Sequence, residues 1–210
     1  MSQVERTTGD GKRRPARERV LAAAARRFYT DGVTATGIDT ITAEAGVAKM
    51  SLYNNFSSKA DLVRAYLDAR HEEWLTQYRS RLQRAESPRD GVLAVFDAYI
   101  DSTVSAQGHG FRGCGLLNAA AELPDGNEGR ALVRRHKEEV ERLIGEHVAA
   151  LLPGSPGTAR TTAEHLAFLL EGAMTRAGLE GDSSRLRHAR AMAANLLDQL
   201  CGGRPEQAPD

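Results

Sequence analysis

Apolar residues recur at spacings of three and four along almost the whole chain, and no stretch has the pattern of a convincing strand. Ala and Leu dominate these stretches, and runs of β-branched residues are absent. The pattern therefore predicts an all-α fold. Helices are expected at about residues 15–30, 36–45, 49–56, 59–83, 87–107, 114–123, 128–151, 158–178 and 182–200.

Two short predicted helices near the N-terminus, 36–45 and 49–56, are joined by the turn Gly46-Val47-Ala48. Two helices joined by a tight turn with glycine have the spacing of a helix-turn-helix. The first 70 residues carry 12 Lys and Arg against 8 Asp and Glu, although the whole chain of 210 residues has 28 of each. A weakly basic N-terminal part is compatible with a polyanion as partner.

The second of these helices has one polar face. With Leu52 and Phe56 turned inward, the four-residue repeat leaves the other side of the helix exposed. Asn side chains can pair with an adenine edge, Lys can reach guanine or a phosphate, and Met can touch a thymine methyl group. Each residue alone would be ordinary surface, but their arrangement on one face favours base recognition. The face consists of Lys49, Met50, Ser51, Tyr53, Asn54 and Asn55.

Phosphate contacts are expected around this face. The long helix begins near Lys59 with free backbone N–H groups and the positive end of its dipole. Thr36 begins a capping-box-like sequence and is expected to cap the helix 36–45. Arg13 and Arg14 of the N-terminal arm are expected to follow the DNA backbone or enter the adjacent minor groove.

A dense motif lies in residues 46–62. Gly46-Val47 is followed by Leu52-Tyr53-x-x-Phe56, and then by Ser58-Lys59 and an acidic residue before Leu62. With this motif, residues 17–63 closely resemble the DNA-binding domain of the TetR/AcrR family of bacterial transcriptional regulators. Residues 112–122 are also similar to one subgroup of that family's C-terminal domains. Ala48 departs from the pattern, because these proteins often carry Ser or Thr there as a cap of the recognition helix.

The resemblance implies a homodimer that binds a palindromic double-stranded DNA operator and acts as a repressor released by a small-molecule effector. Ser51, Tyr53 and Lys59 match phosphate-contacting positions of the family, and the other residues of the exposed face match variable positions that read bases. The implied division of the chain is a disordered basic arm at 1–14, a helix-turn-helix DNA-binding domain at 15–62, an effector-binding and dimerisation domain at 63–201, and a disordered tail at 202–210.

The C-terminal domain is implied to hold the effector pocket and to dimerise through its last two helices. Core packing explains most pocket candidates equally well. The candidates for the pocket are Trp74, Phe96, Tyr99, Phe111, Leu117, Asn118, His136, Phe168, Glu171 and Met174. The candidates for the dimer interface are Leu166, Leu170, Leu186, Ala189, Met192 and Leu196.

Other chemistries find little support. Residues 108–113 satisfy G-x-G-x-x-G, but a helix rather than a strand precedes them, so a dinucleotide site is not expected. His136 and His147 share a helix face at a separation of about 16 Å, which is too far for one metal ion. We therefore expect no metal, no cofactor and no catalytic residue.

The chain lacks the roughly 18 consecutive apolar residues of a membrane helix, and no membrane partner is expected. Cys114 and Cys201 form no Cys-x-x-Cys pair, which fits a reducing interior, and a cytoplasmic location is expected. Cys114 is expected to be a small buried residue rather than a redox sensor. Two alternatives stay open: an effector-independent DNA-binding dimer, and an all-helical small-molecule enzyme.

Overall fold

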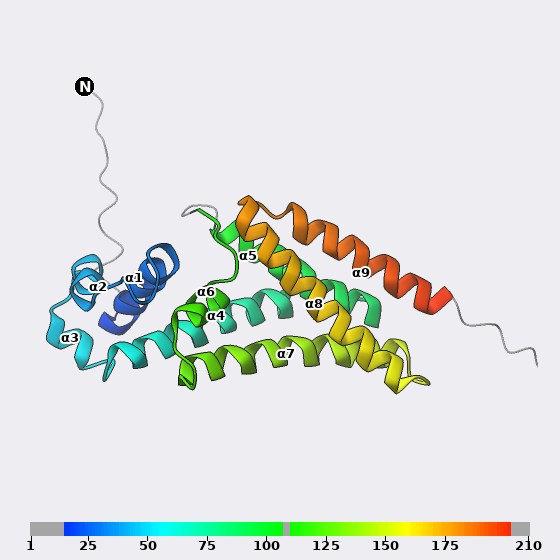
Figure 1. Ribbon diagram of the computed structural model, residues 1–210, viewed down its shortest axis with the longest axis horizontal. Coiled ribbons are helices and arrows are strands. Elements are labelled where there is room, and N and C mark those ends of the chain that lie inside the picture. Colours follow the sequence, from blue (N-terminus) through cyan, green and yellow to red (C-terminus); the bar gives the residue numbers. More distant parts are fainter. Residues whose placement is uncertain (1–14, 107–109, 203–210) are drawn as a thin grey trace, which may run out of the picture.

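The computed structural model describes residues 15–106 and 110–202, and over these residues the protein is all-α, as predicted. Helices α1, α2 and α3 form a head at one end, and α4 runs from the head into a body that contains α5, α7, α8 and α9 (Figure 1). The described helices are α1 (Ala16–Thr30), α2 (Ile38–Ala45), α3 (Lys49–Tyr53), α4 (Lys59–Leu82), α5 (Pro88–Ala106), α6 (Gly115–Glu122), α7 (Glu128–Leu151), α8 (Pro156–Glu180) and α9 (Ser184–Gly202).

The head is a three-helix unit around a small apolar core. Val20, Ala24 and Phe28 follow each other at a spacing of four along α1, and all three are buried. They belong to one cluster with Ile41 of α2 and Leu52 of α3. This cluster continues through the start of α4 to α6 and the start of α7. One continuous apolar cluster therefore joins the head to the body.

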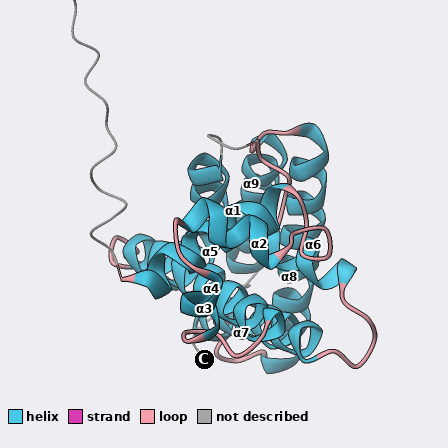
Figure 2. Ribbon diagram, turned by 90° about the vertical axis from the view of Figure 1, so that its left-hand side faces the viewer, coloured by secondary structure: helices cyan, strands magenta, loops and turns pink. Residues whose placement is uncertain are grey.

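The body buries a second apolar cluster. It includes Phe96 of α5, Ile144 of α7, Leu170 of α8 and Leu186 of α9. α5 contacts α4, α7 and α9, so it lies in the middle of the body. Seen from the head end, the body helices lie behind α1 and α2 (Figure 2). No helix within the described ranges is both long and apolar enough to cross a membrane.

One helix boundary differs from its prediction for a packing reason. The sequence predicts that α8 ends at Gly178, but the helix continues to Glu180 and is capped by Gly181 with a φ of +79°. A Cβ on Gly178 would lie 2.7 Å from the Cα of Gly113, in the loop before α6. Gly178 is therefore an interior helix residue whose missing side chain lets that loop approach α8.

The recognition helix is also shorter than predicted. α3 ends at Tyr53, and Asn54 is its C-cap. The N–H groups of Asn55 and Phe56 still bond to the carbonyl of Leu52, at 3.0 Å and 2.9 Å. The chain therefore reaches the buried ring of Phe56 through a tight turn.

Replacing Gly178 with alanine is expected to destabilise the protein, although alanine favours a helix over glycine by about 1 kcal/mol. The new methyl group would meet backbone atoms at Gly113, and overpacking of this kind costs about 1–3 kcal/mol. Gly145→Ala in α7 is the matched control, since its Cβ would lie an ordinary 3.7 Å from the Cβ of Ala163. Thermal unfolding compares the two variants. Equal stability would contradict the close approach.

Candidate nucleic-acid interface and cavity

α3 is fixed by an apolar residue beneath it and a glycine turn before it. Leu52 is fully buried in the head cluster. Gly46, the C-cap of α2, has a left-handed φ of +62°, which glycine adopts without steric cost. Arg19 of α1 donates hydrogen bonds to the carbonyls of Ala45 and Gly46, both at 3.1 Å. These contacts set the direction in which α3 leaves the turn.

The residues predicted on the outer side of this helix reach the surface of the head. Met50 is 71% exposed and Tyr53 is 43% exposed, although both are large apolar side chains. The Nζ of Lys49 lies 2.9 Å from the Oδ1 of Asp39, and this ion pair raises the pKa of Lys49. We call the outer side of α3 and the turn after it the recognition face. It consists of Lys49, Met50, Ser51, Tyr53, Asn54 and Asn55. Ser51 is half-buried and the other five are exposed.

The starts of α3 and α4 are capped differently. Ala48 precedes α3 without a side-chain cap. The hydroxyl of Ser58 caps α4, because it accepts a hydrogen bond from the N–H of Asp61 at 3.1 Å. The carboxylate of Asp61 in turn accepts the N–H of Ser57 at 3.0 Å, which lowers the pKa of Asp61. The start of α4 is therefore rigidly defined next to α3.

Lys59 is the first residue of α4. Its Nζ donates to the carbonyl of Thr34 at 3.3 Å, so the side chain is tied to the loop between α1 and α2. The guanidinium carbon of Arg17 in α1 lies 5.1 Å from the ring centroid of Phe56. Both cations are thus placed by contacts inside the head.

The prediction that Thr36 caps α2 and contacts DNA is wrong. Its side chain is buried, and its hydroxyl donates to the carbonyl of Gly32 at 2.6 Å. The N-cap of α2 is Gly37, without a side-chain hydrogen bond. The hydroxyl of Thr36 instead closes the loop between α1 and α2. The other two predicted contacts of the head, Arg13 and Arg14, lie outside the described residues.

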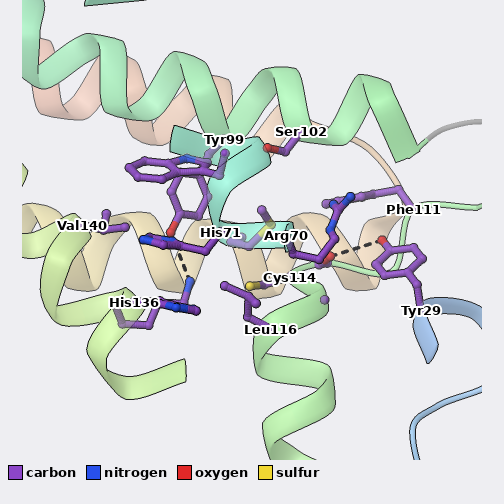
Figure 3. A pocket seen from close by; sticks show the side chains of 15 residues that line it. Tyr29, Arg70, His71, Tyr99, Ser102, Phe111, Cys114, Leu116, His136 and Val140 are labelled. Atoms are coloured by element: carbon purple, nitrogen blue, oxygen red, sulfur yellow. Dashed lines mark hydrogen bonds between the residues drawn. The ribbon is translucent and has the colours of Figure 1, made fainter. Parts of the chain in front are cut away.

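A cavity that is partly open to solvent lies where the body meets the head. Its walls come from α1, α4, α5, α7, α8, the loop before α6 and the start of α6. Side chains from several of these elements converge on it (Figure 3). The predicted pocket residues that line it are Trp74, Tyr99, Phe111, His136 and Met174.

The other predicted pocket residues do not line this cavity. Phe96 is fully buried in the body core, whereas Phe168 is 70% exposed on the outer side of α8. Leu117 packs against the head cluster, and the side-chain amide of Asn118 donates to the carbonyl of Arg112 at 2.9 Å. Helical spacing shows which residues share a face of one helix. It does not show which faces of different helices meet.

Lys137 is the most buried charge at the cavity. Its Nζ lies 2.8 Å from the Oε1 of Glu171 and donates to the hydroxyl of Tyr99 at 3.1 Å. Burial alone would lower the pKa of Lys137, but Cys114, Tyr99 and Glu171 outweigh it and hold this pKa well above its usual value. Glu171, predicted to line the pocket, is therefore the counter-ion of a lining lysine. Sequence spacing gave no signal for Lys137.

Two histidines from distant parts of the chain stack at the cavity wall. The rings of His71 in α4 and His136 in α7 have centroids 4.1 Å apart, with 6° between their planes. His71 Nε2 lies 2.8 Å from Glu139 Oε2. Burial and the neighbouring His71 lower the pKa of His136, so its ring is neutral near pH 7. Within the described part of the chain, no group of three or more His, Cys, Asp or Glu residues is placed to hold a metal ion.

Tyr29, near the end of α1, connects the head to the cavity wall. Its hydroxyl accepts the N–H of Arg112 at 2.7 Å and donates to the carbonyl of Gly113 at 3.2 Å. The guanidinium of Arg112 donates back to the carbonyls of Tyr29 and Thr30. Figure 3 shows Tyr29 at the edge of the cavity with its contact to the loop. We call Tyr29, Arg112 and Gly113 the clasp, which the sequence did not reveal.

The outer side of α8 and α9 carries exposed apolar residues. Phe168, Leu179 and Met192 are 70%, 80% and 47% exposed, and we call these three residues the outer apolar face. The assignment of four residues to a dimer interface is wrong, because they are buried in the core of the protomer itself. These four are Leu166, Leu170, Leu186 and Ala189.

The remaining interface candidates differ from these four. Leu196 is half-buried against the body core, and Met192 belongs to the outer apolar face. The main apolar stripe of α8 and of α9 thus faces the protomer's own core.

Comparison with known proteins begins with the head. The family model described as bacterial regulatory proteins, tetR family, matches residues 20–66. The HTH-type transcriptional activator FasR of Mycolicibacterium smegmatis is 35% identical over 94 residues, which are 43% of each chain. The HTH-type transcriptional regulator TtgR of Pseudomonas putida is 38% identical over 76 residues, or 36% of this chain and 34% of TtgR. The matches span less than half the length of these curated relatives.

Solved structures extend the similarity to the body. SCO4454, a TetR-family transcriptional regulator from Streptomyces coelicolor, is 32% identical with a TM-score of 0.79, and the match covers 89% of this chain and 96% of that one. A tetR-type transcriptional regulator from Streptomyces avermitilis is 26% identical with a TM-score of 0.72, over 90% and 99% of the two chains. The similarity therefore covers both the head, with its helix-turn-helix, and the body. The chain is a member of the TetR family, a non-enzymatic family of DNA-binding transcriptional regulators.

Proposed function

We propose that this regulator binds a palindromic operator as a homodimer, blocks a promoter, and is released by a small molecule that enters the cavity. The recognition face carries this proposal, because it exposes a large apolar side chain, Met50, beside two amides on a helix fixed by buried Leu52. FasR is named an activator and TtgR a regulator, so the direction of regulation is itself part of the proposal.

The recognition face divides into positioning and reading groups. Phosphate contacts fix the register of a protein on DNA, while contacts with base edges carry the specificity. We assign Ser51, Tyr53 and Lys59 to phosphates, and Asn54 and the residues beside it to base edges. The ion pair between Lys49 and Asp39 is exposed on both sides, and such pairs are weak. Lys49 can therefore exchange this partner for DNA.

A second copy of the chain would cover the outer apolar face. A helix-turn-helix dimer binds half-sites about 34–36 Å apart, so its affinity depends on the distance between the two heads. Phe168 and Leu179 are eleven residues apart on α8, which is about three helical turns, so they lie on the same side of that helix. Met192 supplies the neighbouring apolar contact from α9.

The cavity would communicate with the head through the clasp. Tyr29 belongs to α1 and also lines the cavity. A second contact supports the same junction, since the carboxylate of Glu122 accepts the N–H of Thr34 at 2.7 Å. A ligand that favours a different position of the clasp would change the distance between the heads. DNA would then weaken ligand binding by the same factor.

Substitutions on the recognition face test the division of roles. Tyr53→Phe and Lys59→Ala should weaken binding to every duplex, because phosphate contacts do not read sequence. Asn54→Ala should change the preference at particular base pairs by about 1–3 kcal/mol. Binding is measured on DNA that the protein selects from a random pool. If all three variants lose affinity uniformly, the assignment of Asn54 is wrong.

Phe168→Glu is expected to yield a folded monomer. Phe168 is 70% exposed in the protomer, so the change removes little from its core but places a charge in the proposed interface. Met50→Glu is the matched control, because Met50 is 71% exposed on α3. The control should remain a dimer but bind DNA weakly. Analytical ultracentrifugation measures the assembly, and circular dichroism checks the helices. A dimer that survives Phe168→Glu would refute this interface.

Tyr29→Phe keeps the ring but removes both hydroxyl contacts of the clasp. We expect faster amide hydrogen exchange at the end of α1 and the start of α6, with a cost of about 0.5–1.5 kcal/mol per hydrogen bond. Tyr78→Phe is the control, because it removes a 2.7 Å contact between the Tyr78 hydroxyl and His147 inside the body. The control should leave exchange at the clasp unchanged. The same exchange pattern in both variants would argue against the clasp.

A further inference from the structure

The cavity offers aromatic and apolar walls to a ligand. The ring of Trp74 stacks on Tyr78 at a centroid distance of 5.6 Å, and Tyr99 meets it edge-on at 5.5 Å. Phe111 and Met174 add apolar surface. Aromatic rings prefer offset-stacked or edge-to-face neighbours, so these walls favour a flat ring over a bulky aliphatic group.

The charged groups of the lining are cationic. Arg70 and Lys137 line the cavity, whereas none of the described lining residues is Asp or Glu. The carboxylates that pair with these cations do not belong to the lining. Glu73 lies 2.5 Å from Arg70, and Glu171 lies 2.8 Å from Lys137. A ligand therefore meets N–H donors and no lining carboxylate.

Two nitrogens at the cavity lack partners. The indole N–H of Trp74 and the Nδ1 of His136 are buried, and neither has a hydrogen-bond partner among the described residues. An indole N–H donates and cannot accept, so Trp74 requires an acceptor. Buried polar groups without a partner are uncommon in folded proteins. An oxygen atom of a ligand would satisfy this donor.

We propose that the cavity binds a small aromatic carboxylate, a proposal that rests on the effector function inferred above. The ring would lie among Trp74, Tyr99 and Phe111, and the carboxylate would accept hydrogen bonds from Arg70 and the indole N–H. Arg stays charged at physiological pH, and its planar fork matches the two oxygens of a carboxylate.

The electrostatics of the lining disfavour a cationic ligand. An ammonium group would approach Arg70 and Lys137 without a lining carboxylate to receive it. A neutral amide of the same shape would retain the acceptor oxygen for Trp74 but lose the attraction to Arg70. The affinity of the cavity should therefore be highest for the carboxylate, lower for the amide and lowest for the ammonium compound.

The test uses three probes of nearly one shape: 4-methylbenzoate, 4-methylbenzamide and 4-methylbenzylammonium. Trp74 is the only tryptophan of the chain and lines the cavity, so its fluorescence reports occupancy in the full-length protein without DNA. Isothermal titration supplies the affinities. We expect the benzoate to bind at least about tenfold more tightly than the amide, and the ammonium compound to give no saturable change.

Two arginine variants locate the carboxylate. Arg70→Gln should weaken the benzoate by about tenfold and leave the amide nearly unchanged. Arg79→Gln is the matched control, since Arg79 is also on α4 and pairs with Glu72 at 3.6 Å, but does not line the cavity. It should leave the affinities for all three probes unchanged. Equal affinity for the benzoate and the amide, tighter binding of the ammonium compound, or no binding by any probe would overturn the proposal.

A separate measurement distinguishes this inference from the proposed function. Binding of the selected duplex is measured with and without the benzoate. If the probe binds and Arg70→Gln weakens it while DNA stays bound, the ligand class stands and release by an effector fails. If DNA binding is intact but no probe occupies the cavity, the ligand class is wrong and the DNA-binding function stands.

Discussion

The polar contacts between the end of α1 and the loop before α6 decide where the head sits on the body. The hydroxyl of Tyr29 bonds to both Arg112 and Gly113, and Glu122 bonds to the backbone of Thr34. Beneath these few directional contacts, one apolar cluster runs from α1 to α7. Packed cores resist continuous deformation, but a small set of hydrogen bonds can exchange between discrete arrangements. The junction is therefore the place where the position of the head can change without unfolding the core.

The loop at this junction also contacts the other functional surfaces. Gly113 packs against Gly178 of α8 so closely that a Cβ would not fit between them. α8 carries Phe168 and Leu179 on its outer side, and the loop itself lines the cavity with Gly113 and Cys114. A single short segment thus lies against the head, the cavity and the helix of the outer apolar face. In the proposed function, this placement would connect the ligand, the second copy and DNA without a long chain of intermediate residues.

The sequence predicted the all-α fold and the recognition face because both depend on local information. Once Leu52 and Phe56 face inward, the rest of α3 has only one side to occupy. The cavity depends instead on contacts between distant helices: His71 and His136 are stacked, although each looks unremarkable in its own helix. Thr36 shows the limit of a local motif. Its sequence pattern predicts a helix cap, but its hydroxyl donates to the carbonyl of Gly32 instead. The wrong assignment of four buried residues to the dimer interface has a simpler cause. The most apolar stripe of a helix faces the core of its own protomer.

In the proposed function, the two heads of one dimer read two copies of a site. The most direct measurement is selection of random duplex DNA by the purified protein, followed by binding of the enriched sequence over a series of salt concentrations. The dimer should select a palindrome with half-sites about one helical turn apart, and its affinity for this DNA should fall steeply with salt. Recovery of no motif at low salt by a folded dimer would contradict it.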